Sequence, residues 1–243
     1  MRLDVYLVEG GFVDSRTDAK NFILSGAVSV NGRIVKKPAL DVSGDEDISV
    51  DKSGKRFVSR GGLKLEGALE SFHIDVTGAM ALDVGASSGG FTDCLLKRGA
   101  AHVIAVDSGS GQMVESLRLD PRVTVIEGFN ARYMSVDNFE YRPNLAVMDV
   151  SFISARLIIP AVGRVLPAGA DYVCLIKPQF EVGRSGLNKK GIVKSDALRK
   201  AAVDEVVESA CYSGFECIGI IESPITGGDG NIEYLAHFRK KDI

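Results

Sequence analysis

From about residue 60 to the end of the chain, short apolar runs alternate with segments of helical pattern. The runs are nearly continuous stretches of Val, Ile, Leu and Ala, typical of strands buried on both faces. Their alternation with helices indicates a parallel sheet covered on both sides. The predicted strands lie at 79–85, 101–107, 122–128, 144–150 and 171–177. The predicted helices lie at 89–99, 113–119, 154–166 and 196–214.

Two more apolar segments, 215–223 and 231–240, close the chain with only a loop between them. Such a short connection predicts an antiparallel hairpin at one end of the sheet. A mostly parallel sheet that ends in this way resembles a Rossmann-like methyltransferase. The predicted fold class is therefore α/β, with a seven-stranded sheet of that kind preceded by a small α+β domain.

The first fifty residues predict a separate unit. Segments 2–11 and 15–26 have helical patterns; Ser15 can cap the second helix and Gly26 can end it. Segment 27–38 predicts a hairpin around its Asn-Gly pair, and 45–50 a third strand. We predict a small α+β domain at 1–51, a linker at 52–59 and a methyltransferase-like domain at 60–243.

The charge distribution is more informative than the net charge of -3. Residues 16–37 carry five bases and one acid, and residues 52–64 carry five bases and no acid. Residues 41–51 between them carry five acids, so the bases form local patches. Charge alone is equally consistent with a solvated surface and with a nucleic-acid interface.

The order R-L-D-x-x-L, S-R-x-x-A-x-x-x-I-x-x-G-x-V-x-V-N-G and V-x-x-P closely resembles the S-four RNA-binding domain over residues 2–50. In that family the second helix and the hairpin present bases to RNA phosphates, a contact that gives affinity without reading sequence. By matching position, the resemblance implies that RNA contacts Arg2, Arg16, Lys20, Arg33 and Lys36.

A glycine-containing segment, LDVGASSGGF, follows the first strand of the large domain. Glycine there lets the backbone approach a ligand closely. Ser87 replaces the second glycine of the dinucleotide pattern, which is therefore incomplete. Asp107 ends the next strand, where a carboxylate can accept ribose hydroxyls. A tight structural turn would explain the glycines alone, but glycines and acid together favour an adenosine cofactor, S-adenosyl-L-methionine over NAD.

Polar residues follow two other predicted strands. Lys177 leaves an apolar run in LIKPQFE, and Asp149 follows another in MDVSF. Since ligands bind at the carboxyl edge of a parallel sheet, Lys64 and Glu233 could meet them there. Lys, Asp, Lys and Glu in this order resemble the catalytic tetrad of FtsJ-like ribose 2′-O-methyltransferases. With SRGGLKL and GNIEYL also present, nearly the whole chain resembles the TlyA family of rRNA 2′-O-methyltransferases.

The chemistry agrees with this resemblance. A ribose 2′-hydroxyl is a poor nucleophile, so its proton must be removed or its developing charge stabilised. Lys64 nearby could lower the pKa of Lys177 and make it a base, whereas Asp149 and Glu233 favour charged lysine and an electrostatic role. The sequence leaves both roles of Lys177 open.

Other residues are assigned with the family in view. Phe91 and Phe152 pack either near the cofactor or in the core, and Asn130 is implied to contact adenine. Segment 179–195 is basic and long enough for a flexible RNA-clamping lid or for a solvated loop. The predicted cofactor-binding residues are Asp83, Gly85, Ala86, Ser87, Gly89, Gly90, Phe91, Asp107, Asn130 and Asp149. In addition to the five in the first domain, the predicted RNA-binding residues are Arg60, Arg184 and Lys189.

Two functions compete with rRNA methylation. Relatives of this family are often labelled hemolysins, but no signal peptide or apolar run of about 18 residues is present. A non-catalytic RNA-binding protein would not need the tetrad. Four scattered cysteines and three histidines predict a reducing cytoplasm and no metal site. We expect a cytoplasmic monomer that acts on cytidine in ribosomal RNA or a ribosomal subunit, with the large subunit favoured.

Overall fold

The computed structural model describes residues 1–50, 56–227 and 230–242, and the chain divides into two compact units, Met1–Arg56 and Phe57–Ile243. Of the predicted linker, residues 52–55 lie outside the described residues. The second unit begins three residues before the predicted start at Arg60, because the Phe57 ring is buried in that unit's core.

Two helices form one layer of the first unit: α1 (Leu3–Glu9) and α2 (Arg16–Ser25). The Ser15 side chain accepts a hydrogen bond from the backbone N–H of Asp18, and Gly26 ends α2 in the left-handed conformation with φ 82°. Both helix ends are therefore as the sequence predicts.

The other layer of this unit is a three-stranded antiparallel sheet with strand order β2-β1-β3. Its strands are β1 (Val28–Val30), β2 (Arg33–Ile34) and β3 (Ile48–Val50). Asn31 and Gly32 both have positive φ, 50° and 73°, as a two-residue type I′ turn requires. The predicted hairpin is confirmed.

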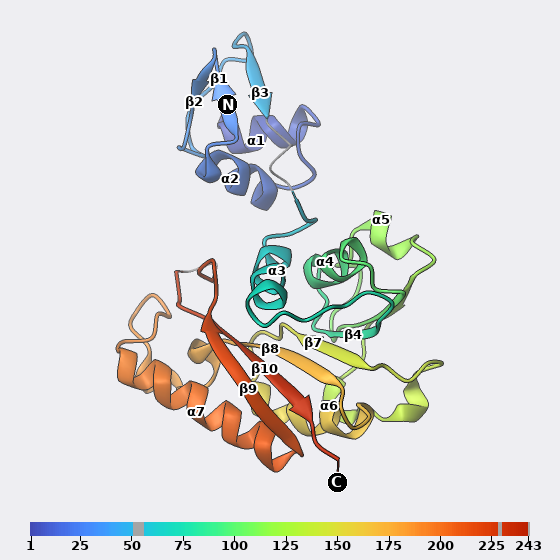
Figure 1. Cartoon of the computed structure of the whole chain (residues 1–243). Helices are drawn as coiled ribbons and strands as arrows, with labels where there is room; N and C mark the ends of the chain where they lie inside the picture. Colours follow the sequence, from blue (N-terminus) through green and yellow to red (C-terminus); the bar gives the residue numbers. More distant parts are fainter. Residues whose placement is uncertain (51–55, 228–229, 243) are drawn as a thin grey trace. The chain divides into compact units, whose positions relative to one another are not determined.

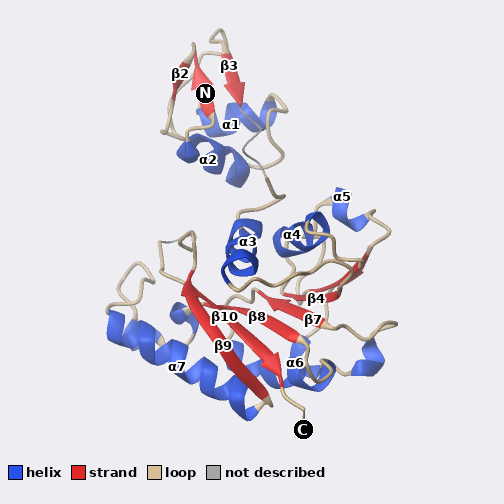
Figure 2. Cartoon of the chain, in the orientation of Figure 1, coloured by secondary structure: helices blue, strands red, loops and turns tan. Residues whose placement is uncertain are grey.

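The second unit contains a seven-stranded sheet of order β6-β5-β4-β7-β8-β10-β9 (Figures 1 and 2). Strands β4 to β8 are parallel, and β10 is antiparallel to both β8 and β9, so the predicted fold class is confirmed. The strands are β4 (Met80–Val84), β5 (His102–Val106), β6 (Val123–Ile126), β7 (Leu145–Met148), β8 (Asp171–Ile176), β9 (Phe215–Glu222) and β10 (Tyr234–Lys240).

Helices cover both faces of this sheet. In Figure 1, α3 (Gly61–Ser71) and α4 (Gly90–Lys97) lie on one face, and α6 (Ile159–Val165) and α7 (Asp196–Tyr212) lie on the other. Each pair packs on its own apolar cluster. Shorter helical pieces are α5 (Glu115–Arg118), η1 (Ala131–Tyr133), η2 (Val136–Asn138), η3 (Ala155–Leu157), η4 (Pro178–Phe180) and η5 (Arg184–Gly186).

The helix predicted at 154–166 is broken in the structure. It consists of η3 and then α6, with Pro160 as the second residue of α6. Proline is favoured at the start of a helix and disrupts the interior of one. A helical pattern with proline inside it therefore divides at that residue.

The sheet has a switch point between β4 and β7. The chain runs outward from β4 through β5 to β6 and then returns to the opposite side of β4 with β7. In open α/β sheets, ligands bind outside the carboxyl ends of the strands at such a point. The segments after β4, β5, β7 and β8 are thus the candidate site.

Candidate active site

The segment between β4 and α4 forms a turn in which positive φ recurs at every second residue: 84° at Gly85, 47° at Ser87 and 94° at Gly89. A Cβ atom at Gly85 would lie 2.5 Å from the carbonyl oxygen of Asp149. Glycine is therefore required at position 85 both by conformation and by the close approach of the segment after β7. The serine that departs from the glycine pattern adopts the left-handed conformation itself.

The start of α4 packs closely against the start of α3. A Cβ atom at Gly90 would lie 2.1 Å from Oγ of Ser59 and 3.1 Å from the backbone nitrogen of Gly62. This contact fixes the SRGG segment, and with it Lys64 on α3, beside the glycine turn.

Asp107 lies directly after β5 and is half-buried. Its Oδ2 accepts the N–H of Ser87 at 2.8 Å, and its Oδ1 accepts the N–H of Gly109 at 2.7 Å. A carboxylate has about four lone-pair sites, so two further donors can be accommodated. The acid therefore ties the glycine turn to β5 and retains the capacity to hold a diol.

Asp83, on β4, is fully buried. Burial raises the pKa of this carboxyl to about 7, opposed by the hydrogen bond that Thr92 Oγ1 donates to Oδ2 at 2.7 Å, and Asp149 and Asp107 raise the pKa further. The other oxygen, Oδ1, is buried without a hydrogen-bond partner among the described residues. An unpaired buried oxygen is costly, so this position suits a donor from a ligand.

The remaining predicted cofactor residues are placed differently. Ala86 and Phe91 are 5% and 3% exposed and belong to the apolar cluster beneath α3 and α4. For Phe91 the structure therefore selects the core, one of its two predicted locations. Asn130 is exposed after β6, where its side chain accepts the N–H of Arg132 and caps η1.

At the carboxyl edge, Lys177 meets Asp149. The Lys177 Nζ lies 2.5 Å from Asp149 Oδ1 and donates to Ser151 Oγ at 2.7 Å. The lysine side chain is 10% exposed and the aspartate side chain 22%. Strands β7 and β8 are parallel neighbours, so the segments that follow them emerge side by side. An almost buried ammonium thus lies next to a carboxylate that is only partly exposed.

The other two residues of the predicted tetrad form a second ion pair. Lys64 Nζ lies 2.5 Å from Glu233 Oε2, with the two side chains 10% and 2% exposed. Gln179 donates to Glu233 Oε1 at 3.0 Å. Because Gln179 follows Lys177 by two residues, it connects the two ion pairs.

Phe152 lies at the same edge and is 91% exposed, so of the two locations predicted for this ring the core is excluded. Its φ of 62° is rare for a bulky residue and turns the side chain outward. The ring centroid lies 5.2 Å from that of Phe180, and Lys177 Nζ lies 6.0 Å from the Phe180 ring. An aromatic pair therefore borders the lysine.

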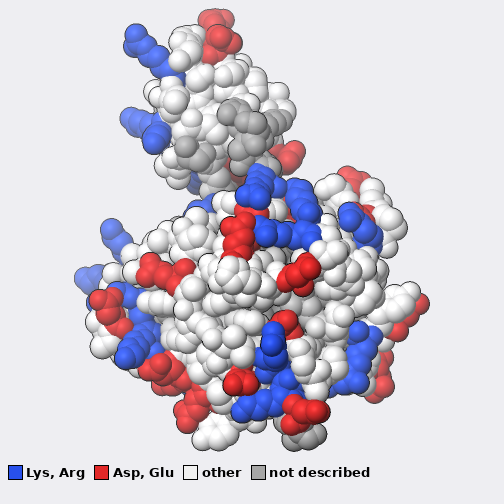
Figure 3. All heavy atoms as spheres, in the orientation of Figure 1, with Lys and Arg blue, Asp and Glu red and all other residues white. Residues whose placement is uncertain are grey.

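In the first unit, two of the predicted RNA-binding arginines converge on one buried acid. Asp4 accepts Nε and NH2 of Arg2 at 2.9 and 3.0 Å and NH2 of Arg16 at 3.2 Å. The Arg2 hydrogen bond lowers the pKa of Asp4 to about 2. Lys20, Arg33 and Lys36 are exposed, and Figure 3 shows basic side chains on the side of this unit where α2 and β2 lie.

Three of the predicted RNA-binding residues belong to the second unit. Arg60 is exposed and donates to the carbonyl of Thr226 at 3.1 Å. Arg184 and Lys189 are exposed on segment 179–195, which is folded. Buried Asn231 accepts the N–H of Val193 and donates to the carbonyl of Gly191, and this joins the basic segment to the one that supplies Glu233.

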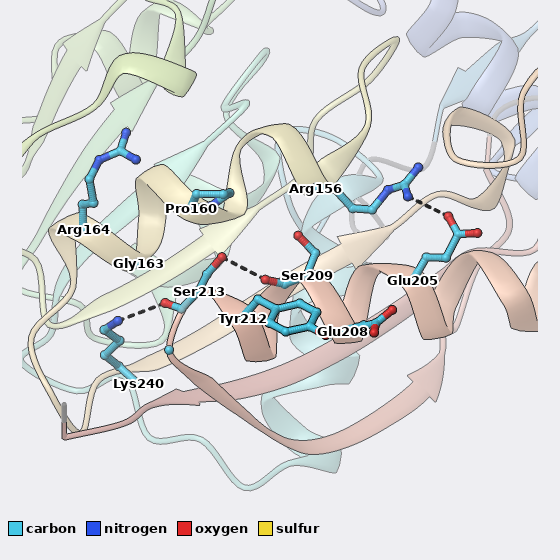
Figure 4. Close-up of a pocket in the computed structure, with 11 residues that line it drawn as sticks. Arg156, Pro160, Gly163, Arg164, Glu205, Glu208, Ser209, Tyr212, Ser213 and Lys240 are labelled. Atoms are coloured by element: carbon cyan, nitrogen blue, oxygen red, sulfur yellow. Dashed lines mark hydrogen bonds and ion pairs between the residues drawn. The ribbon is translucent and has the colours of Figure 1, made fainter.

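An open hollow between α6, α7 and the end of β10 is drawn in Figure 4. Its cations already have partners: Arg156 pairs with Glu205, Arg164 donates to the carbonyl of Arg132, and Lys240 donates to the carbonyl of Ser213. Lys240 ends β10, whereas Glu233 precedes it, so this part of the hollow lies at the edge opposite the tetrad. No ligand chemistry is assigned to it.

A seven-stranded sheet with a terminal antiparallel hairpin, a glycine turn after β4 and an acid after β5 defines the class of Rossmann-like methyltransferases. The FtsJ-like methyltransferase model matches residues 57–240, and the S4 domain model matches residues 1–48. The chain belongs to the FtsJ-like methyltransferase family and carries an S4 domain at its N-terminal end.

The relatives extend over the whole chain. It is 44% identical to the 16S/23S rRNA (cytidine-2′-O)-methyltransferase TlyA of Mycobacterium tuberculosis, over 98% of this chain and 89% of that protein. It is also 44% identical to Hemolysin A of Brachyspira hyodysenteriae, over 98% and 99%. A solved structure of a hemolysin from Streptococcus thermophilus has 42% identity and a TM-score of 0.80, and covers 100% of this chain and 89% of that one. No helix in the described ranges combines the length and the apolar character needed to cross a bilayer.

Sequence reasoning missed three residues that organise the site and one that holds two arginines in the first unit. Ser151, Gln179 and Asn231 lie in the motifs MDVSF, LIKPQFE and GNIEYL, and this position was the sequence signal that could have identified them. Asp4 is the acid of the R-L-D motif, and a buried partner for Arg2 and Arg16 could have been suspected from that spacing. In each case the motif marks the residue, but only the fold supplies its partner.

Proposed function

We propose that this protein transfers a methyl group from S-adenosyl-L-methionine to the ribose 2′-hydroxyl of a cytidine in ribosomal RNA. One observation carries the proposal: the segment with Asp149 touches the glycine turn at Gly85 and at the same time holds Lys177. A group bound at the glycine turn would therefore lie next to the carboxyl edge of the sheet. At this edge the Lys177–Asp149 pair and the Lys64–Glu233 pair are linked through Gln179.

The residues present fit this cofactor. Asp107 can accept ribose hydroxyls, and Asp83 Oδ1 is buried without a hydrogen-bond partner among the described residues. When bound there, the cofactor supplies an electrophilic methyl group on a sulfonium. Ser87, Gly89 and Gly90 would contribute the close backbone approach of the turn.

Lys177 is proposed to act as an ammonium that stabilises the developing charge on the 2′-oxygen. Its Nζ forms an ion pair with Asp149 and donates a hydrogen bond to Ser151, so the group is held at the edge of the sheet. An ammonium has three N–H donors, so one remains for a substrate oxygen. The exposed Phe152 ring offers a nucleobase a stacking surface beside that oxygen. The base role of Lys177 remains the alternative.

We assign RNA affinity to exposed basic side chains. The two arginines held by Asp4 present a fixed pair of charges, and Lys20, Arg33 and Lys36 add phosphate contacts on the same unit. Arg60, Arg184 and Lys189 would contact RNA near the target nucleotide. Ribosomal RNA is favoured because a relative at 44% identity is named for it. The large subunit stays the proposed target, and the cytoplasm the proposed location.

The decisive experiment incubates the purified protein with tritiated S-adenosyl-L-methionine and unmodified rRNA from each ribosomal subunit, followed by mapping of 2′-O-methyl groups. We expect label on a cytidine ribose, lost in Lys177→Ala. Label on a base, or none on either rRNA, would contradict the proposal. Lysis of red cells by the purified protein would instead support the activity for which the Brachyspira relative is named.

A further inference from the structure

Glu181 is the last residue of the LIKPQFE motif, and its carboxylate accepts hydrogen bonds from three donors. Oε2 accepts the hydroxyl of Ser154 at 2.5 Å and Nε of Arg156 at 3.2 Å, and Oε1 accepts the N–H of Ala155 at 2.8 Å. The side chain is only 2% exposed. A carboxylate so deeply buried and so fully bonded is held in one position.

All three donors belong to the segment after β7, whereas Glu181 belongs to the segment after β8. These are the two segments that carry Asp149 and Lys177. Ala155 is the first residue of η3, so the carboxylate also caps that short helix where its N–H groups are unpaired. Glu181 thus joins the two segments at their C-terminal ends.

The same two segments are joined at two further points. Asp149 pairs with Lys177 at their beginning, and Phe152 contacts Phe180 in the middle. The unusual φ of Phe152 lies between Asp149 and the residues that Glu181 holds. Such a conformation persists where the surrounding structure fixes it from both sides.

We infer that Glu181 is a positioning residue for methyl transfer: by fixing the segment after β7 against the segment after β8, it holds Asp149, Lys177 and Phe152 in their reactive arrangement. This inference rests on the proposed function. Glu181 itself touches neither Lys177 nor Asp149 in the bonds described, so it acts through the backbone. Misplacement of a reacting group by about 1 Å can cost on the order of a hundredfold in rate.

The test uses the full chain and four variants. Glu181→Gln keeps the size of the side chain but turns an N–H₂ group toward a donor. Ser154→Ala removes one of the three bonds, and Ser154→Thr restores a hydroxyl. The matched control is Asp171→Asn, because Asp171 is a half-buried acid at the opposite end of β8, bonded to His237 and Arg239.

We expect Glu181→Gln to lower kcat by on the order of tenfold to a hundredfold and Ser154→Ala by less. Ser154→Thr should recover much of the rate. In each, KM for rRNA and the Kd of S-adenosyl-L-methionine should stay within about twofold of wild type, because a group that acts in the transition state changes kcat alone. Asp171→Asn should leave kcat unchanged even if it lowers Tm.

Two results would overturn the inference. One is wild-type kcat in folded Glu181→Gln. The other is a fall in kcat that is always accompanied by weaker cofactor binding and a lower Tm, which would indicate a general structural role. Wild-type protein that methylates no RNA would refute the proposed function instead, so the two failures are distinguishable.

Discussion

Lys64 and Glu233 are 169 residues apart in sequence, yet Nζ of the lysine lies 2.5 Å from Oε2 of the glutamate in the interior of the second unit. Two buried charges are stable only as a pair, since either one alone would be unpaired and desolvated. The pair therefore ties α3 to the start of β10 and fixes the distance between the N-terminal and C-terminal parts of the candidate site.

Breaking this pair should destabilise the protein. Glu233→Leu leaves Lys64 buried without its carboxylate, and we expect a loss of about 3–5 kcal/mol in the free energy of unfolding. The double variant Lys64→Met/Glu233→Leu should recover most of that loss and remain inactive. Denaturant unfolding and a methyl-transfer assay on the same samples measure both quantities. An active double variant would remove Lys64 and Glu233 from the proposed catalytic set.

Lys177→Ala should abolish methyl transfer with little change in cofactor or RNA affinity, because the ammonium is needed as the 2′-oxygen gains charge. Lys177→Arg separates the two roles: arginine keeps the charge but cannot act as a base. Substantial activity in the arginine variant would support the electrostatic role. Wild-type kcat in Lys177→Ala would mean that LIKPQFE is not the centre of the site.

Asp107→Ala should weaken binding of S-adenosyl-L-methionine and leave RNA binding intact. The expected loss is about 1.5 to 3 kcal/mol for each charge-assisted bond to a ribose hydroxyl. Asp120→Ala is the control, because Asp120 also accepts a backbone N–H, that of Arg122, but precedes β6. Calorimetric titration gives the Kd of S-adenosyl-L-methionine for each variant. Equal Kd values for Asp107→Ala and Asp120→Ala would exclude Asp107 from the cofactor site.

Asp83 should make the stability of the second unit depend on pH. Its pKa in the folded protein is raised from 3.8 to about 7, chiefly by burial, so the folded state binds a proton that the unfolded state releases. This contribution is fully present below about pH 4 and is lost as pH rises toward 7. Asp83→Asn cannot ionise, so its Tm without cofactor should fall less than that of wild type between pH 5 and 7.5. Parallel curves would show that Asp83 is not the cause.

The second unit alone should bind cofactor but methylate RNA poorly. The fragment must begin at Phe57, because that ring is part of the core. It keeps the glycine turn and Asp107 but lacks Arg2, Arg16 and the other bases of the first unit. Loss of those phosphate contacts should also flatten the salt dependence of RNA binding. Full activity in the fragment would show that the first unit is dispensable.

Local features of the chain were readable from sequence. The Asn31–Gly32 turn, the Ser15 cap and the seven strands are as predicted, because each depends on the steric preferences of a few neighbouring residues or on a repeating pattern of burial. The exceptions are also local: the predicted helix at 154–166 is divided near Pro160, and the start of the second unit moves to Phe57.

The sequence by itself determined which polar residues stand at strand ends, because strand boundaries follow from apolar runs. Only the tertiary structure decided their partners. Glu233 meets Lys64 of α3 because β10 runs antiparallel to β8 and so begins at the carboxyl end of that strand. Glu181 meets Ser154 because β7 and β8 are adjacent. Phe152 faces solvent although its residue type favours the core. These relationships depend on strand order and register, which are set by the packing of the whole sheet and not by any short stretch of sequence.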